Sequence, residues 1–195
     1  MNKTDFLHHF RLKELKQPVN QYKHPTTLKA AAVLILLVDD GKSLQVLLTK
    51  RAEHLKHHPG QISFPGGKVE PSDKNIIATA LRETREEIGL NIPEDNIVGQ
   101  LHPYQTISGF IVTPMIAIVS EYKDYVIDQN EVAEVFYVPL QHFLNQKNHQ
   151  SIILEHKGKP HPVTFMPYKH YNIWGATAAM LKDLSNHLSI SKAKP

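Results

Sequence analysis

The chain of 195 residues contains no cysteine. Disulfide bonds, iron–sulfur clusters and thiol nucleophiles are therefore excluded. Long hydrophobic runs are also missing, because the longest, Ala30 to Val38, is far shorter than the roughly 20 apolar residues that cross a bilayer. The N-terminal sequence lacks the continuous apolar core of a secretory signal, and the terminal SKAKP is not a peroxisomal address. We expect a cytoplasmic protein that does not bind membranes.

A strong net charge is absent as well. The formal charge is +3 with neutral histidines, which is too small to indicate a nucleic-acid partner but favours a small anionic substrate. The 13 histidines occur without an HExxH motif or a cysteine partner, so we expect no zinc site. The hydrophobic content of 41% and the length are ordinary for one soluble globular domain.

The hydrophobic pattern predicts more strands than helices, which indicates an α/β fold with a mixed sheet flanked by helices. Residues 1–27 are expected to form an N-terminal helix and a connector, and residues 28–190 a single domain. No internal repeat, coiled-coil seam or long exposed edge strand is apparent. The predicted strands cover 28–38, 44–49, 61–64, 97–102, 111–119, 134–138, 151–156 and 163–166, and the predicted helices 6–15, 71–88, 139–144 and 173–188.

The most informative segment is GGKVEPSDKNIIATALRETREEIGL, from Gly66 to Leu90. A helix turns by about 100° per residue, so Glu83, Glu86 and Glu87 fall on one arc of this segment. Carboxylates this close repel each other, and a divalent cation relieves that repulsion because Mg²⁺ prefers oxygen ligands and substrate phosphates. The segment therefore predicts a metal platform for phosphate chemistry.

The alternative is an ordinary solvated acidic face, which is the usual fate of glutamate pairs on helices. The preceding Gly66 and Gly67 favour a functional site, because glycine lets a backbone carbonyl approach a ligand closely. We expect the helix to begin with Ser72 or Asp73 as its N-cap and to end at Gly89.

The run RETREEIGL, Arg82 to Leu90, resembles the Nudix hydrolase signature G-x5-E-x7-R-E-U-x-E-E-x-G-U, in which U is aliphatic. Thr84 stands at a position that is usually aliphatic. The front half departs, since Asp73 replaces the first glutamate and eight residues separate it from Arg82. The role of Asp73 stays open. The resemblance implies a Nudix-type α/β/α sandwich over residues 28–190 and a metal-dependent diphosphatase.

We expect Glu83 and Glu87 to bind Mg²⁺ or Mn²⁺ directly, and Glu86 directly or through water. The carbonyl of Gly67 would complete the shell. Arg82 is expected to hold the glutamates in register by charge-assisted hydrogen bonds. The sequence leaves two candidates for the general base, Glu86 and Glu131.

A second motif precedes the first. The stretch LLTKRAEHLKHHPGQISFPGG, Leu47 to Gly67, resembles LLTxRSxxLRxHxGQxxFPGG of the coenzyme A pyrophosphatase branch of the Nudix family. Lys56 stands where this branch usually has arginine, and Ala52 where it has serine. Arg51, Lys56 and His58 are expected to bind the anionic ligand together with Gly66 and Gly67 of the glycine turn. The alternative is a solvated basic loop.

The resemblance implies hydrolysis of coenzyme A to 4′-phosphopantetheine and adenosine 3′,5′-bisphosphate. The main alternative is a Nudix hydrolase of another diphosphate, such as ADP-ribose, NADH or nucleoside di- and triphosphates. A catalytically silent nucleotide-binding module is a further alternative, although it predicts a broken glutamate set. Monomer and homodimer both stay open. Ser108 to Phe110 is a candidate pocket segment, and Trp174 is expected chiefly to pack its helix.

Overall fold

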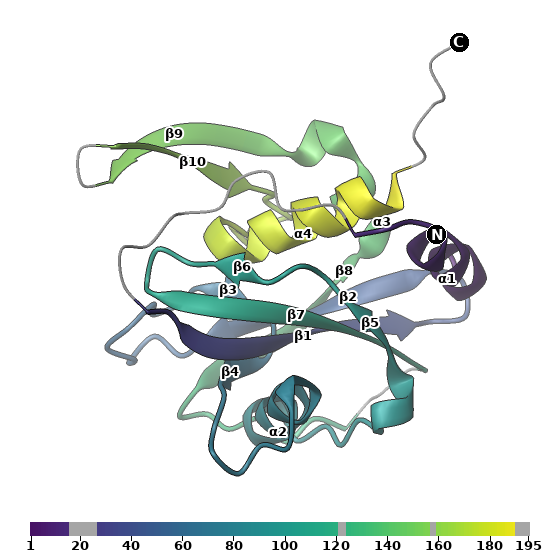
Figure 1. Cartoon of the computed structure of the whole chain (residues 1–195), viewed down its shortest axis with the longest axis horizontal. Coiled ribbons are helices and arrows are strands. Elements are labelled where there is room, and N and C mark those ends of the chain that lie inside the picture. Colours follow the sequence, from purple (N-terminus) through teal and green to yellow (C-terminus); the bar gives the residue numbers. More distant parts are fainter. Residues whose placement is uncertain (16–26, 121–123, 157–158, 190–195) are drawn as a thin grey trace.

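The computed structural model describes residues 1–15, 27–120, 124–156 and 159–189. Figure 1 shows three layers: one helix below a twisted mixed sheet, and the remaining helices above it. A two-stranded hairpin lies beyond the upper helices. The strands are β1 (Lys29–Asp39), β2 (Leu44–Arg51), β3 (Ile62–Ser63), β4 (Gly66–Lys68), β5 (Ile97–Gln100), β6 (Tyr104–Gln105), β7 (Phe110–Ser120), β8 (Val132–Pro139), β9 (Gln150–His156) and β10 (Lys159–Phe165), and the helices α1 (Lys3–Arg11), α2 (Ile76–Ile88), α3 (Leu140–Leu144) and α4 (Gly175–Leu188).

The parallel pair of β1 and β7 forms the centre of the main sheet, while the other pairings are antiparallel. The expectation of a mixed sheet in an α/β sandwich is confirmed. Strand β1 reads as a continuous apolar run because both of its faces are covered. Ile35 and Leu37 contribute to the core on the α4 side, and Leu34 and Leu36 to the core on the α2 side.

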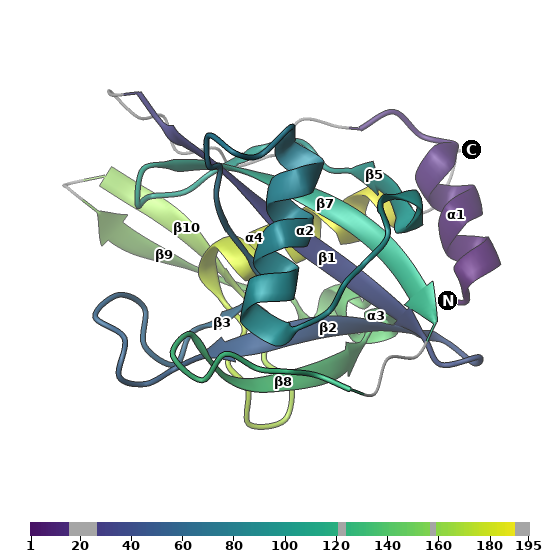
Figure 2. The same cartoon turned by 90° about the horizontal axis from the view of Figure 1, so that it is seen from below.

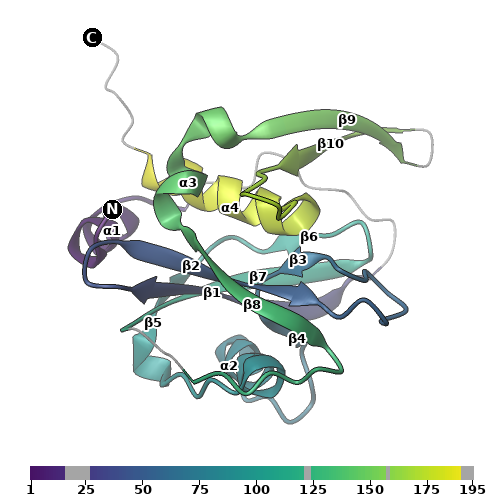
Figure 3. The ribbon, with the colours of Figure 1, turned by 180° about the vertical axis from the view of Figure 1, so that it is seen from behind.

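Helix α2 lies across one face of the sheet, as Figure 2 shows from below. It contacts β1 and β4, and the fully buried Thr84 and Ile88 anchor it. The opposite face carries α4, with α1 and α3 packed against it (Figure 3). Phe6 and Phe10 of α1 belong to the same core as α4. None of the described helices combines the length and apolar composition that a membrane crossing requires.

Most predicted elements are present with shifted ends, but three expectations were wrong. Gly66 to Lys68 were expected to form a turn, and they form strand β4, antiparallel to β1. Strand β6 was not expected. The last strand was expected to begin at residue 163, and β10 begins at Lys159 instead. The predicted connector falls largely on residues 16–26, outside the described residues.

Candidate active site

Helix α2 begins later than expected. Its N-cap is Asn75, whose side chain accepts a hydrogen bond from the Ala78 backbone N–H at 2.8 Å. The prediction of Ser72 or Asp73 as cap was wrong, because an asparagine two to three residues later accepts a hydrogen bond from an exposed backbone donor of the first turn. The predicted end at Gly89 is confirmed: this residue is in the left-handed region with φ 73°.

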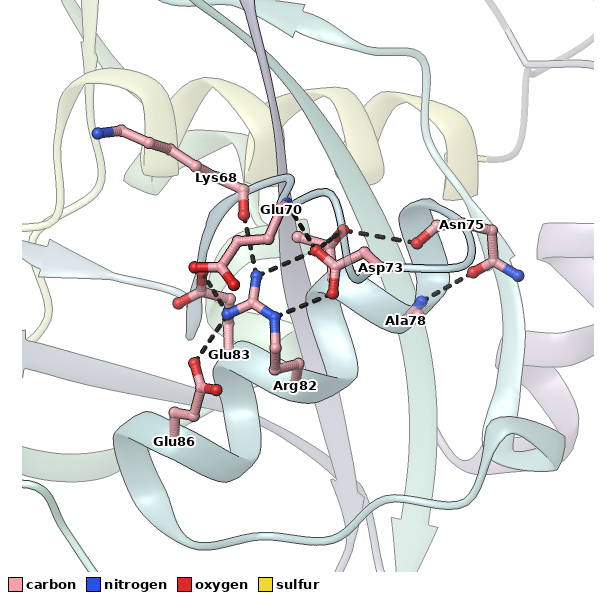
Figure 4. Close-up of polar contacts among 9 residues, drawn as sticks. Lys68, Glu70, Asp73, Asn75, Ala78, Arg82, Glu83 and Glu86 are labelled. Carbon is pink, nitrogen blue, oxygen red and sulfur yellow. Dashed lines mark hydrogen bonds and ion pairs between the residues drawn. The ribbon is translucent and has the colours of Figure 1, made fainter.

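Asp73 instead binds Arg82, as Figure 4 shows. The Arg82 Nε donates to Oδ1 of Asp73 at 2.9 Å, and Nη2 donates to Oδ2 at 3.1 Å. The Glu70 backbone N–H and the Thr79 hydroxyl also donate to Oδ2, each at 2.8 Å. This two-pronged bond to Arg82 holds the pKa of Asp73 well below its usual range. Asp73 is therefore placed to hold the guanidinium rather than to face a metal.

The remaining N–H groups of Arg82 donate hydrogen bonds to two glutamates of α2 and to a carbonyl of β4. Nη1 of Arg82 donates to Glu83 at 3.1 Å and to Glu86 at 2.8 Å, and Nη2 also donates to the Lys68 carbonyl at 3.0 Å. Figure 4 shows the guanidinium between Asp73 on one side and the two glutamates on the other. One arginine thus joins strand β4, the loop before α2 and two turns of the helix.

Glu87 is the most unusual charged residue of the site. Its exposed fraction is only 4%, although the helical arc suggested a position beside Glu86 on an open face. Its Oε2 atom has no hydrogen-bond partner. Burial raises the pKa of Glu87 to about 8, with the neighbouring charge of Glu83 as the next largest cause. A buried carboxylate with an unpartnered oxygen is a ready ligand for a cation.

Glu83 lies directly against Gly67. A Cβ atom added to Gly67 would meet the Glu83 carboxylate oxygens at 2.4 and 2.6 Å. Burial raises the pKa of Glu83 as well, while Arg82 opposes this shift. Glycine at position 67 therefore makes room for the carboxylate next to the backbone of β4.

Strand pairing brings two further predicted residues to the same place. Arg51 pairs with Val132, and the Ala52 N–H donates to the Glu131 carbonyl at 2.9 Å. The negative charge of Glu131 raises the pKa of Glu87, and the positive charge of Arg51 lowers it. Residues far apart in sequence thus act on one buried carboxylate.

The donor set fits a divalent cation. In the part of the chain that the structure describes, no three His, Asp or Glu side chains already converge as a formed metal site. Arg82 holds one oxygen of Glu83 and one of Glu86. The fit rests on the donors themselves, since the buried Glu87 has an oxygen without a partner and Glu83 lies against Gly67. Hard carboxylate oxygens next to a glycine strand suit Mg²⁺ or Mn²⁺.

Two pockets adjoin the basic loop. The apolar pocket, of about 390 Å³, lies between α4, β10 and the turn before β7. Asp183 of α4 is a charged residue of its wall, and burial raises its pKa to about 6. The polar pocket, of about 570 Å³, is lined by Lys50 and the ring of His170 and also by the carboxylates of Glu53 and Glu134. Both pockets are lined by His58, Gln61 and Trp174.

The residues predicted to bind the anionic ligand from the basic loop lie in different surroundings. His58 lines both pockets and holds a left-handed backbone with φ 56°, which is uncommon for a residue other than glycine. Lys56 is exposed, and no contact among the described residues joins it to the acidic cluster. Trp174 is the N-cap of α4, stacks on Phe165 and also lines both pockets.

Sequence reasoning missed several of these residues. Asn75 was identifiable in principle, since an asparagine before Ile76 is an ordinary N-cap signal. His161 and Asp183 of the apolar pocket carry no local signal, because only the packing of β10 and α4 brings them together.

Replacing Asp73 with Asn tests its role as the partner of Arg82. We expect the free energy of unfolding at pH 7 to fall by about 1–3 kcal/mol, because Arg82 keeps only part of its bonding. The pKa of Asp73 is lower in the folded state, so its stabilisation is present above about pH 4 and is lost as the pH falls through the folded value. The variant should therefore lose less stability than the parent between pH 4 and pH 2, as measured by urea unfolding. Equal losses would contradict the Asp73–Arg82 assignment.

With this geometry established, comparisons with known proteins define the class. A family model described as the NUDIX domain matches residues 28–156. The match covers more than half of the chain, which therefore belongs to the Nudix hydrolase family. Nudix hydrolases act on pyrophosphate bonds of small nucleotide substrates and generally use divalent metal ions.

Relatives extend the match along nearly the whole chain. The Nudix hydrolase NudL of Yersinia pestis (strain Pestoides F) is 36% identical over 191 residues, which are 96% of this chain and 95% of the relative. Among solved structures, the MutT protein from Methanosarcina mazei Go1 is 22% identical, with a TM-score of 0.49 over 63% of this chain and 84% of that chain. The NUDIX domain of Shewanella oneidensis NrtR, solved in complex with ADP ribose, is 20% identical, with a TM-score of 0.46 over 74% and 87% of the two chains.

Proposed function

We propose that this Nudix hydrolase cleaves the diphosphate of coenzyme A or its derivatives, releasing 4′-phosphopantetheine and adenosine 3′,5′-bisphosphate. Coenzyme A carries a 3′-phosphate besides its diphosphate, so it requires more cationic contacts than a plain nucleoside diphosphate. Its remaining arm is long and largely uncharged. A site for it needs an acidic metal centre, a basic surface and a roomy pocket of low polarity.

One observation carries this proposal: the segment that resembles the coenzyme A pyrophosphatase branch borders both the acidic cluster and the two pockets. Its Arg51 acts on the buried Glu87, and its Gly67 contacts Glu83. Its His58 and Gln61 line both the apolar and the polar pocket. A segment that resembles the branch only by chance would have no reason to border both the acidic cluster and the pockets.

In this proposal the residues of the acidic cluster have separate roles in hydrolysis. Glu83, Glu87 and the Gly67 carbonyl would hold the Mg²⁺ or Mn²⁺, with Glu86 beside them. When bound, such a cation would lower the pKa of water and would spread the charge that develops on the diphosphate. Arg82 keeps Glu83 and Glu86 in register through hydrogen bonds of 3.1 and 2.8 Å.

The water must also lose a proton to a side chain. Glu86 and Glu131 are the two candidates for the general base, and the contacts favour Glu131. Glu86 already accepts a hydrogen bond from Arg82, whereas the exposed Glu131 lies close enough to raise the pKa of both Glu83 and Glu87.

A substrate panel tests the proposal. We expect kcat/KM for coenzyme A to exceed that for 3′-dephospho-coenzyme A, ADP-ribose and NADH by about tenfold or more, since each charge-assisted phosphate contact contributes about 1.5–3 kcal/mol. Products are identified by chromatography after incubation with Mg²⁺ or Mn²⁺. A preference for ADP-ribose or NADH would assign the chain to another Nudix activity. Absence of metal-dependent hydrolysis on the whole panel would favour a binding module.

A pair of glycine variants tests whether His58 contacts the substrate. His58 and Lys169 are the two described residues other than glycine with positive φ, at 56° and 53°. Glycine accepts this conformation, so His58→Gly and Lys169→Gly should each change the free energy of unfolding by less than about 1 kcal/mol. Only His58→Gly is expected to raise KM for coenzyme A, because His58 lines both pockets and Lys169 lines neither. Equal kinetics in the two variants would remove His58 from the substrate site.

A further inference from the structure

Strand β9 presents an open edge to solvent. It pairs only with β10 in the described part of the chain, and the two strands form a sheet separate from the main one. Figures 1 and 3 show this hairpin projecting from the body of the protein, with β9 on its outer side. Every residue from 150 to 155 is exposed. The sequence had given no sign of a long exposed edge strand, so that expectation was wrong.

The composition of β9 is unusual for an unpaired edge. Ile152, Ile153 and Leu154 are consecutive, with exposed fractions of 47%, 74% and 44%. Soluble proteins usually protect such an edge with proline, lysine or a bulge, because its free N–H and C=O groups pair readily with another strand. Strand β9 contains no proline, lysine or bulge, whereas its partner β10 contains Pro160 and Pro162. The hairpin therefore has one protected strand and one strand that is suited to pairing.

We propose that β9 pairs antiparallel with β9 of a second copy of this chain, around a two-fold axis at Ile153. The two hairpins then form one four-stranded sheet. The sequence of β9 is self-complementary in this register: Ile153 lies opposite its own copy, Ile152 opposite Leu154, and Ser151 opposite Glu155. Apolar pairs occupy the centre, and the only acidic residue of the strand lies opposite a small hydroxyl.

Neighbouring registers are less favourable. Moving the axis to Leu154 places the charged Glu155 opposite Ile153, and moving it to Ile152 places Ile153 opposite Ser151. A register that places Ile153 opposite Leu154, with the axis between two residues, would bring opposite faces of the two hairpins together, because side chains alternate along a strand. Self-pairing at Ile153 is thus what selects a second copy over an unrelated strand. Pairing of two strands of seven residues buries less surface than a standard interface of about 1,600 Å². We therefore expect a reversible dimer at micromolar concentrations.

Because the chain contains no cysteine, a single introduced cysteine can be used to test the pairing by disulfide cross-linking. Antiparallel partners have Cα atoms about 4.5–5.5 Å apart, within the range of a disulfide. Under mild oxidation, Ile153→Cys should form a covalent dimer about tenfold faster than Val126→Cys, a control at an equally exposed apolar residue (74% and 75%). Ser151→Cys and Glu155→Cys should each cross-link slowly alone and rapidly when mixed. Rates equal to the control, or no preference for the mixture, would overturn the proposal.

Charge variants test the association without a covalent bond. Two lysines would face each other in Ile153→Lys, so this variant should be monomeric in sedimentation velocity at concentrations where the parent and Val126→Lys are dimeric. Mixing Ile153→Lys with Ile153→Glu should restore a dimer containing one copy of each. Unchanged circular dichroism and melting temperature establish that each variant is folded. A monomeric parent at 100 μM, or a dimer that Ile153→Lys leaves intact, would contradict the pairing.

Discussion

Replacing Glu87 with Gln is expected to lower kcat by about 10³-fold while leaving the protein folded and more stable at pH 7. The loss follows from the position of the carboxylate. Oε2 of Glu87 is buried, has no hydrogen-bond partner and lies among the charges of Glu83, Glu131 and Arg51. An amide keeps the shape of this side chain but cannot supply the negative charge that a divalent ligand site requires.

The gain in stability has the same cause. Burial raises the pKa of Glu87 from 4.5 to about 8, so between these values the folded protein holds a proton that the unfolded chain has lost. Stability of the metal-free parent therefore falls as the pH rises from about 4.5 to 8. Glutamine does not titrate, so Glu87→Gln should show a flatter profile and an unfolding free energy about 1–2 kcal/mol higher at pH 7.

Urea unfolding between pH 4.5 and pH 8, with and without Mn²⁺, measures this effect directly. Mn²⁺ should raise the stability of the parent, because it binds the folded form, and should have little effect on Glu87→Gln. Glu94→Gln, an exposed carboxylate in the 3₁₀ turn Glu94–Asn96, serves as the control and should behave as the parent in every assay. A Glu87→Gln enzyme with parental kcat would show that the buried carboxylate lies outside the catalytic site.

The sequence predicted the elements whose signals are local. The apolar run in β1, the helix through Arg82 and Glu87 and its end at Gly89 follow from periodicity and glycine chemistry, and all are present. The expected contacts of Arg82 are also present, since it hydrogen-bonds Glu83 and Glu86. Gly67 lies against Glu83, and the role of its carbonyl stays a prediction.

What the sequence could not predict depends on contacts through space. The spacing of Asp73 indicated only a departure from the Nudix signature. Its two hydrogen bonds to Arg82 form because the loop before α2 folds back toward the helix. Burial of Glu87 depends on the sheet under the helix, not on helical position alone. The pocket residue Asp183 and the open edge of β9 likewise become visible only once β10 and α4 are packed.

The second large effect is expected from adding a single methyl group. In Gly67→Ala the new Cβ would lie 2.4 Å from Oε1 of Glu83, well inside van der Waals contact. The backbone at Gly67 does not have positive φ, so alanine fits the strand itself, and the flexible carboxylate must move. We expect kcat/KM to fall by about 10²–10³-fold, because a displacement of about 1 Å at a catalytic group has an effect of this size. The melting temperature should change little.

Gly66→Ala is the matched comparison, one residue earlier in the same strand. Its Cβ would meet the Ala32 carbonyl oxygen at 2.4 Å and the Val33 Cα at 2.6 Å, and its φ is 154°. These neighbours are backbone atoms of β1 that cannot move aside, so we expect a loss of about 3 kcal/mol or more in stability. The two glycines thus separate fold from site: the first holds β4 against β1, and the second leaves room for Glu83. Parental activity in a folded Gly67→Ala protein would mean that the position of Glu83 does not matter to the reaction, and the metal assignment would then be wrong.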